Sequence, residues 1–402
     1  MSELFINSEI GKLKKIMLHR PGLEIDRLVP EELNEVLFED IPWMNRMKTE
    51  HDSFVATLKS NGVEVLYLSD LLEEIISIKQ AKNELIELVL SEVNKDDYVI
   101  SALREFLLSQ DNKSLTKYLI SGLGEDEFKL DKSYLSDYME DKYSYYFKPL
   151  PNLYFMRDVG AVIKRGISYS KMKTDIRRRE SMLVREIFTY KENLKPDNVY
   201  YDNKTERMSL EGGDILVLND ECVLIGFSER TSREAIDKIS YNLLTMDSGI
   251  KKVLAMKIPH VRAFMHLDTV FTMLDYDKFI IFPNILKDIE VVTITVDKMK
   301  QLHYNNEDRL DLALAKALKI RGVNIIESGG NNKVISAREQ WNDSTNTFAI
   351  SPGHVITYNR NEITNDILTK NNIKVTVIEG SELVRGRGGP RCMSMPIQRE
   401  RL

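Results

Sequence analysis

The feature that most constrains the fold is a repeated alternation of short strands and amphipathic helices. Runs rich in β-branched and aromatic residues, among them DILVLND, CVLIGF, KFIIFPN and HVITYNR, are bounded by Gly, Asn and Asp, which is typical of strands. Amphipathic helical patterns follow pairs of such runs, at residues 174–188, 230–240, 305–318 and 360–371. Two of these helices begin beside side chains that commonly cap helices: Thr231 or Ser232, and Asn361 with Thr364.

The strand and helix patterns recur at a nearly constant spacing. From Asp158 to Asp214 is 56 residues, and from Asp214 to Asp268 is 54. A period of this length predicts similar ββαβ units arranged around a centre. An open, doubly wound α/β sheet is the alternative, although no Gly-x-Gly-x-x-Gly turn follows the first strand.

A different pattern occupies the segment from about Asp70 to Tyr146. No proline occurs between Pro42 and Pro149, and apolar residues recur at helical spacing in LLEEIISIKQAKNELIELVLSEV and SALREFLLSQ. We therefore expect an inserted helical domain over residues 70–146, and an α/β domain built from residues 1–69 and 147–402.

Composition and charge exclude several classes of protein. The net charge is -6, so the chain has no basic excess for binding nucleic acid. The N-terminal sequence lacks the apolar core of a signal peptide, and no apolar run approaches the roughly 20 residues that span a bilayer. We expect a cytoplasmic protein with no membrane partner.

Only two cysteines occur, which argues against a disulfide framework and against a cysteine-rich zinc site. Cys222 lies in the apolar run CVLIGF, and we expect it to be a buried strand residue. Cys392 lies in RGRGGPRCMSMP, a stretch rich in Gly and Arg with little to bury. Cys392 is therefore the candidate reactive cysteine.

Four stretches concentrate polar side chains where strands are expected to end. They are PNLYFMRDVGAV with Asn152, Arg157 and Asp158, LEGGDILVL with Glu211 and Asp214, FMHLDTVFTML with His266 and Asp268, and the Cys392 loop. On a strand, residues two apart point to the same face, so we expect the side chains of His266 and Asp268 to project together. Taken singly, these stretches also fit a core histidine, a tight turn, a surface ion pair and a phosphate-binding loop.

Taken together, these residues fit the chemistry of a guanidinium substrate. Several carboxylates select a cation, and the planar guanidinium fork matches bidentate carboxylates. The central guanidinium carbon is a poor electrophile, so a thiolate nucleophile flanked by carboxylates is a sensible solution. A histidine would then protonate the departing nitrogen and later activate a water. We expect the arginines beside Cys392 to lower the pKa of its thiol.

The sequence resembles the arginine deiminases of the guanidine-modifying (pentein) superfamily almost from end to end. The resemblance includes SEIGKLKKIMLHRPG, FMRD, LEGGD, HLDTVFT and RGRGGPRCMSMP, in this order. It implies a five-bladed ββαβ propeller with a helical insertion, and hydrolysis of free L-arginine to L-citrulline and ammonia as the first step of arginine catabolism. It also implies that the enzyme needs no metal or other cofactor and forms a homodimer or homotetramer.

The resemblance implies a role for each matching position. Cys392 would be the nucleophile that forms an S-alkylthiouronium adduct, and His266 the general acid and base. Asp158 and Asp268 would clasp the guanidinium, and Glu211 would contribute to the guanidinium site and support His266.

The resemblance also implies a binding site for the substrate carboxylate, formed by Asn152, Arg177 and Arg230. Arg178 and Arg179 adjoin Arg177, so the sequence leaves open which of the three binds. Arg387 resembles a loop arginine that can sit near the cysteine in the empty enzyme and move on binding. Some relatives carry His where this chain has Arg391. A fixed positive charge there would favour the thiolate, so we expect activity to persist toward neutral pH.

Other functions remain open at this point. An amidinotransferase of the same superfamily would pass the same adduct to an amine, and a related deiminase would act on agmatine or methylated arginines. A metal-dependent hydrolase would use a ligand set of His266, Asp268, Glu211 and Asp158. A non-catalytic arginine-binding protein on the same fold is the last alternative.

Overall fold

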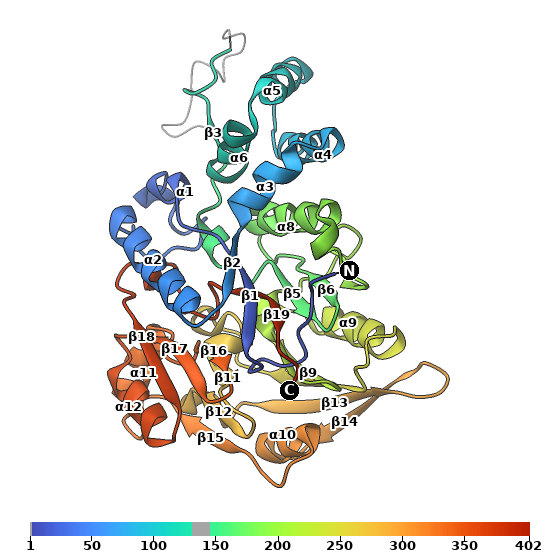
Figure 1. The fold of residues 1–402 in the computed structure, drawn as a ribbon, viewed down its shortest axis with the longest axis vertical. Helices are drawn as coiled ribbons and strands as arrows, with labels where there is room; N and C mark the ends of the chain where they lie inside the picture. The colour runs from blue at the N-terminus through green and yellow to red at the C-terminus, as the bar shows by residue number, and fades with distance from the viewer. Residues whose placement is uncertain (1, 131–144) are drawn as a thin grey trace.

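The computed structural model of the chain describes residues 2–130 and 145–402 (Figure 1). Its central feature is a ββαβ unit that occurs five times. In each unit the first two strands are antiparallel; a short turn joins them in four of the units, and in the fifth they come from the two ends of the chain. The second and third strands are parallel, because a helix carries the chain back between them.

The five units, numbered here by position, have the following bounds. Unit 1 is β5 (Gly160–Ile163), β6 (Gly166–Tyr169), α8 (Arg178–Tyr190) and β7 (Val199–Tyr201). Unit 2 is β8 (Ile215–Asn219), β9 (Cys222–Phe227), α9 (Arg233–Thr245) and β10 (Lys252–Lys257). Unit 3 is β11 (Phe271–Met273), β12 (Lys278–Ile281), α10 (Leu310–Leu318) and β15 (Asn324–Glu327). Unit 4 is β16 (Phe348–Ser351), β17 (His354–Tyr358), α12 (Glu362–Lys370) and β18 (Lys374–Ile378). Unit 5 joins the two ends of the chain, with β19 (Met395–Arg399), β1 (Leu13–Leu18), α2 (Met44–Ser60) and β2 (Glu64–Tyr67).

Hydrogen bonds close the five units into a ring. Each bond joins the segment just before the first strand of one unit to the same segment of the next. The five bonds are Gly212 N to Asp158 O (3.0 Å), Leu267 N to Asp214 Oδ1 (2.7 Å), Asn346 Nδ2 to Asp268 O (3.1 Å), Cys392 N to Asn346 Oδ1 (2.9 Å) and Arg157 N to Cys392 O (2.9 Å). The prediction of similar ββαβ units around a centre is confirmed, and the open doubly wound sheet is wrong.

Insertions in the ring explain why the regular spacing ends after Asp268. The hairpin of β13 (Glu290–Val296) and β14 (Leu302–Glu307) leaves unit 3 and extends the sheet of unit 2 to five strands. A further helix, α11 (Lys333–Trp341), precedes unit 4. Shorter helices are α1 (Leu23–Asp26) and the 3₁₀ turns η1 (Pro30–Glu32), η2 (Pro151–Tyr154), η3 (Asp175–Arg177), η4 (Glu192–Leu194), η5 (Gly212–Asp214), η6 (Arg262–Phe264), η7 (Leu267–Thr269), η8 (Pro283–Ile285) and η9 (Leu383–Gly386).

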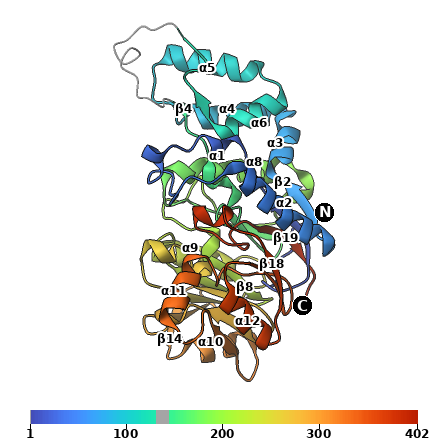
Figure 2. The ribbon, with the colours of Figure 1, turned by 90° about the vertical axis from the view of Figure 1, so that its left-hand side faces the viewer.

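Four helices stand on one side of the ring, next to α8 (Figure 2). They are α3 (Leu68–Ile76), α4 (Lys79–Leu90), α5 (Asp97–Ser109) and α6 (Asn112–Ser121), followed by a small pairing of β3 (Leu123–Gly124) with β4 (Tyr145–Phe147). Their buried apolar side chains belong to the same hydrophobic cluster as those of unit 1. Residues 131–144 of the predicted insertion lie outside the described residues, and its division from the rest as a domain stays a prediction.

The caps of two predicted helices were tested by the structure. Ser232 caps α9, because its hydroxyl accepts a hydrogen bond from the backbone of the first turn. Asn361 stands at the start of α12 but makes no such bond, so the prediction of an Asn361 cap is wrong. Instead the carboxylate of Glu339, from α11, accepts hydrogen bonds from the backbone N–H of Ile363 and Thr364. A carboxylate there also complements the helix dipole.

Cys222 opens strand β9 and is fully buried among apolar side chains, as the sequence predicts. Burial raises the pKa of its thiol to about 12, so it is unreactive at neutral pH. Among the helices that the structure describes, none is long and apolar enough to cross a membrane.

Candidate active site

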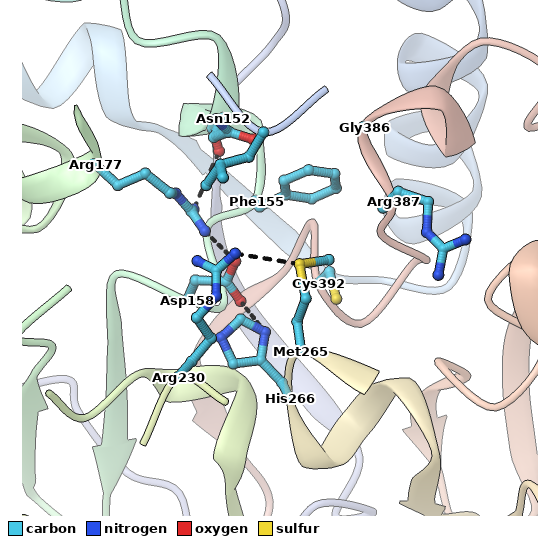
Figure 3. A pocket seen from close by; sticks show the side chains of 11 residues that line it. Asn152, Phe155, Asp158, Arg177, Arg230, Met265, His266, Gly386, Arg387 and Cys392 are labelled. Carbon is cyan, nitrogen blue, oxygen red and sulfur yellow. Dashed lines mark hydrogen bonds and ion pairs between the residues drawn. The ribbon is translucent and has the colours of Figure 1, made fainter. Parts of the chain in front are cut away.

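The predicted site residues converge at the centre of the ring (Figure 3). Seven of the nine line one buried cavity: Asn152, Asp158, Arg177, Arg230, His266, Arg387 and Cys392, together with Leu37, Phe155, Met265 and Gly386. The other two, Glu211 and Asp268, are fully buried and contact His266 and Cys392. The free space is only about 20 Å³, which holds about one water molecule. A larger ligand must therefore displace side chains when it enters.

The fold explains this convergence. Asp158, Asp268 and Cys392 each lie two or three residues before the first strand of their unit. Since these segments are hydrogen-bonded to one another around the ring, residues distant in sequence meet at the centre. The repeat therefore places one polar side chain per unit at a common point.

Asp268 lies in the 3₁₀ turn that precedes β11, and His266 is the residue just before that turn, so the prediction that they share a strand face is wrong. The turn is fixed by Asp214, whose Oδ1 accepts a 2.7 Å hydrogen bond from Leu267 N, and by the hydroxyl of Thr269, which donates to His266 O at 2.6 Å. The side chain of His266 consequently contacts Glu211, whereas that of Asp268 contacts Cys392.

His266 lies between two carboxylates. Its Nε2 is 2.7 Å from Oε2 of Glu211, and its Nδ1 is 3.7 Å from Oδ1 of Asp158. Burial opposes the charged form of the ring, but Asp158, Glu211 and Asp214 outweigh burial and raise the pKa of His266 to about 9. Burial likewise opposes ionisation of Glu211, yet His266 and two arginines lower the pKa of Glu211 to about 2. The pair is an imidazolium and a carboxylate at neutral pH.

The thiol of Cys392 is buried and hydrogen-bonded to Asn346. Asn346 Nδ2 donates to Sγ at 3.0 Å, and its Oδ1 accepts from Cys392 N at 2.9 Å. Sγ is 3.7 and 3.8 Å from the two oxygens of Asp268. Burial, then Asp268, Asp158 and Asp343, raise the pKa of Cys392 well above its ordinary value. The expectation that neighbouring arginines lower this pKa is therefore wrong for the empty site.

The effect of Arg391 on the thiol is outweighed, because its charge is largely neutralised by two carboxylates. Its Nη1 donates to Oδ2 of Asp268 at 2.7 Å, while Nε and Nη2 donate to Glu9 Oε2 at 3.2 and 3.1 Å. Nη2 also donates to the carbonyl of Ile215 at 2.8 Å. The fully buried guanidinium thus fixes Asp268 to the N-terminal segment rather than facing Sγ.

We expect Arg391→His to narrow the pH range of activity. A guanidinium stays charged at every working pH, whereas an imidazole is charged only below its own pKa. Above that pKa, the buried carboxylates of Asp268 and Glu9 would lose the positive charge that is hydrogen-bonded to both of them. The measurement is the pH–rate profile, in which the variant should lose activity at lower pH than the parent on the alkaline side. Identical profiles would refute this account of Arg391.

Three residues that line the cavity have a buried polar atom with no hydrogen-bond partner among the described residues: Asp158 (Oδ1), Arg230 (Nη1) and Arg387 (Nη1). Arg177 Nη1 donates to Oδ2 of Asp158 at 2.7 Å, but Oδ1 of Asp158 has no hydrogen-bond partner among the described residues. Nη1 of Arg230 also has none there, and it lies 3.9 Å from Oε2 of Glu211. Buried polar atoms are normally hydrogen-bonded. A free carboxylate oxygen and a free guanidinium nitrogen are suited to a ligand with a cationic end and an anionic end.

Asn152 and Arg387 line the cavity, but both side chains are engaged elsewhere. Asn152 Nδ2 donates to the carbonyl of Val36 at 2.6 Å. The guanidinium of Arg387 packs over the ring of Trp341, 3.5 Å from its centroid, and Nη2 donates to Ala263 O at 3.4 Å. Figure 3 shows this guanidinium turned away from Cys392, so the structure does not place it on the cysteine.

Asn346 is the site residue that the sequence analysis missed. It lies two residues before β16, just as Asp158 lies two residues before β5. The position of Asn346 in its repeat could have indicated it. However, β13, β14 and α11 lengthen the chain between Asp268 and Asn346, so the regular spacing is lost there. The amide of Asn346 is hydrogen-bonded to both the thiol and the backbone N–H of Cys392.

A metal-binding arrangement exists in part. Ligand atoms of Asp158, Glu211 and His266 lie within 4.8 Å of one another, and Asp268 is not part of that group. The guanidinium groups of Arg177 and Arg230 lie against these carboxylates, and His266 already carries a positive charge at neutral pH. Their repulsion of a divalent cation disfavours the metal-dependent alternative.

Comparison with known proteins agrees with this geometry. The sequence model of the family described as arginine deiminase matches residues 34–399. The chain belongs to the arginine deiminase family. An arginine deiminase of Streptococcus agalactiae serotype V is 45% identical over 99% of this chain and 98% of its own length. One of Clostridium perfringens is 44% identical over the same shares.

A solved structure shares the fold at much lower identity. An amidinotransferase from Microseira wollei superposes with a TM-score of 0.55 at 13% identity, covering 100% of this chain and 98% of that one. The family fold therefore extends to enzymes whose sequences have diverged widely, in agreement with the predicted pentein fold.

Proposed function

We propose that this protein hydrolyses free L-arginine to L-citrulline and ammonia, with Cys392 as the nucleophile. The observation that carries the proposal is the set of groups around one small cavity: the buried thiol of Cys392, the unpartnered carboxylate oxygen of Asp158 and the unpartnered guanidinium nitrogen of Arg230. The carboxylate is suited to a guanidinium, and Arg230, with Arg177 and Asn152, is suited to an α-carboxylate.

Substrate binding would activate the thiol. The carboxylates of Asp268 and Asp158 contribute to the raised pKa of Cys392 in the empty site. A guanidinium bound between them would neutralise their charge and add a positive charge beside Sγ, and both changes favour the thiolate. Ionisation of the nucleophile would then be coupled to the binding of the cationic substrate, and the thiol proton would be released to solvent before the site closes around the substrate.

The reaction then proceeds in two halves. The thiolate attacks the central guanidinium carbon, the C–N bond to a terminal nitrogen breaks, and that nitrogen leaves as ammonia with a proton from His266. A covalent S-alkylthiouronium remains. Water gives a proton to His266 and its oxygen adds to the adduct carbon. The C–S bond breaks to release citrulline, and the hydroxyl proton of the adduct ends on ammonia as ammonium.

The remaining residues act through these groups. Glu211 holds His266 by Nε2 and keeps it charged before ammonia leaves. Asn346 positions Sγ and the nucleophile segment. Arg391 holds Asp268 in place through a hydrogen bond to its Oδ2. When the cavity enlarges on binding, the guanidinium of Arg387 would leave the ring of Trp341 and contact the substrate.

The wider setting of the enzyme follows from its family. We infer a cytoplasmic homodimer or homotetramer that performs the first step of arginine catabolism, with residues 70–146 as an inserted helical domain. The described helices α3 to α6 support the helical insertion, and the relatives at 41–45% identity, which are named arginine deiminases, support the reaction.

The test is product formation from L-arginine in metal-free buffer with EDTA. Equal amounts of citrulline and ammonia are expected, and activity that survives the chelator would count against a metal-dependent hydrolase. Parallel reactions would supply glycine or ornithine as acceptors, and agmatine as an alternative substrate. A guanidino product formed from an acceptor would favour an amidinotransferase, and turnover of agmatine alone would favour a different deiminase.

A further inference from the structure

Glu180 is a buried carboxylate beside the site with no part in the reaction proposed above. It lies in the first turn of α8, three residues after Arg177, and only 1% of it is exposed. It does not line the cavity. Its Oε2 accepts a 2.9 Å hydrogen bond from Arg177 Nε and lies 2.9 Å from Nη2. One edge of the Arg177 guanidinium is therefore occupied by Glu180.

Asp158 holds the remaining nitrogen of the same guanidinium. Arg177 Nη1 donates to Oδ2 of Asp158 at 2.7 Å, while Nη2 reaches the carbonyl of Asn152 only at 3.4 Å. Because the two carboxylates bind different nitrogens, Arg177 can exchange Asp158 for another anion and still keep Glu180.

A contribution to folding stability does not by itself explain the buried ion pair of Glu180 and Arg177. Burial raises the pKa of Glu180 to about 7 although Arg177 opposes the shift, so keeping the carboxylate charged is costly. A buried ion pair is often no more stable than apolar side chains of the same size. The presence of this buried ion pair is better explained if Glu180 fixes the position of Arg177.

Resting on the function proposed above, we propose that Glu180 is a positioning residue for the carboxylate end of the substrate. In the empty site, Glu180 and Asp158 share Arg177. In the complex, the substrate guanidinium replaces Arg177 at Asp158. Glu180 still holds the Nε edge of Arg177, so that Nη1 of Arg177 is free to bind the substrate α-carboxylate. Glu180 thereby selects for arginine over guanidinium compounds that lack the carboxylate.

The test compares two ligands that differ by this carboxylate. L-Arginine and agmatine are titrated by calorimetry into Cys392→Ala, which would not turn them over, with and without Glu180→Gln. Glutamine has nearly the same shape but no charge. The preference for arginine over agmatine should fall about tenfold, the effect of weakening one charge-assisted contact. In the enzyme with Cys392 intact, KM for arginine should rise about tenfold while kcat stays within about twofold.

Glu186→Gln is the matched control. Glu186 lies in the same helix, is also buried, and accepts a 2.9 Å hydrogen bond from Lys204 Nζ away from the cavity. The ligand preference should not change in this variant. An unchanged preference in Glu180→Gln, an equal loss in Glu186→Gln, or a loss confined to kcat would overturn the inference. Failure of the parent Cys392→Ala to bind arginine would instead refute the proposed function.

Discussion

Cys392→Ala should lower the turnover of L-arginine by about 10⁴-fold or more, because removal of a covalent nucleophile leaves only binding and electrostatic effects. The measurement is citrulline formed under saturating substrate. Mass spectrometry of acid-quenched parent enzyme should show a covalent adduct on Cys392, and the variant should show none. Turnover within tenfold of the parent would rule out covalent catalysis by this residue.

Cys222→Ala is the matched control for the nucleophile. Its thiol is also fully buried, but it faces the apolar core rather than the cavity. Removing its sulfur should cost about 1–2 kcal/mol of unfolding free energy, with little change in turnover. A comparable loss of activity in this variant would mean that the effect of Cys392→Ala is not specific to the site.

A binding measurement on Cys392→Ala separates the part of the cysteine in catalysis from any part it has in binding arginine. Loss of the thiol should leave Asp158, Asp268 and Arg230 in place, so arginine should still bind. The proposed coupling between substrate charge and thiol ionisation adds a further expectation for the parent enzyme. Thiolate absorbance in the ultraviolet should rise when a guanidinium ligand that is not turned over binds at neutral pH. No change on binding would contradict that coupling.

The sequence predicted the repeating elements well because their signals are local. Runs such as CVLIGF and KFIIFPN are strands in the structure, since each carries its own β-branched pattern and turn residues. The spacing between Asp158, Asp214 and Asp268 predicted similar units arranged around a centre. The convergence of Cys392 with His266 and Asp158 follows from that ring.

The electrostatics of the site could not be predicted, because they depend on residues far apart in sequence. Arg391 looked like an activator of the adjacent Cys392. Its guanidinium is instead occupied by Glu9, from the opposite end of the chain, and by Asp268. Whether a neighbouring charge faces the thiol is decided by burial and by partners from other units, and these leave no local pattern. The 3₁₀ turn at Leu267–Thr269 was missed for a related reason, since it is pinned by Asp214 of the preceding unit.

His266→Gln should lower kcat by about 10³-fold, within the usual range for loss of a general acid and base. Glutamine retains a donor that can meet Glu211 but cannot release a proton to ammonia or accept one from water. If His266 activates the water, any adduct that forms in the variant should persist, and mass spectrometry after a single mixing should detect it. His51→Gln is the control, because His51 is fully buried, outside the cavity, and its pKa is lowered to about 3, chiefly by burial.

The same histidine sets the alkaline limit of activity. Its raised pKa of about 9 means that the imidazolium persists through neutral pH and is lost as the pH rises through that value. Since the proposed acid is the protonated ring, kcat/KM of the parent should fall on the alkaline side near pH 9. His266→Gln has no such proton, so its residual activity should lack this decline. A parent profile that stays level beyond pH 10, or a variant that keeps the same decline, would show that a different group provides the proton.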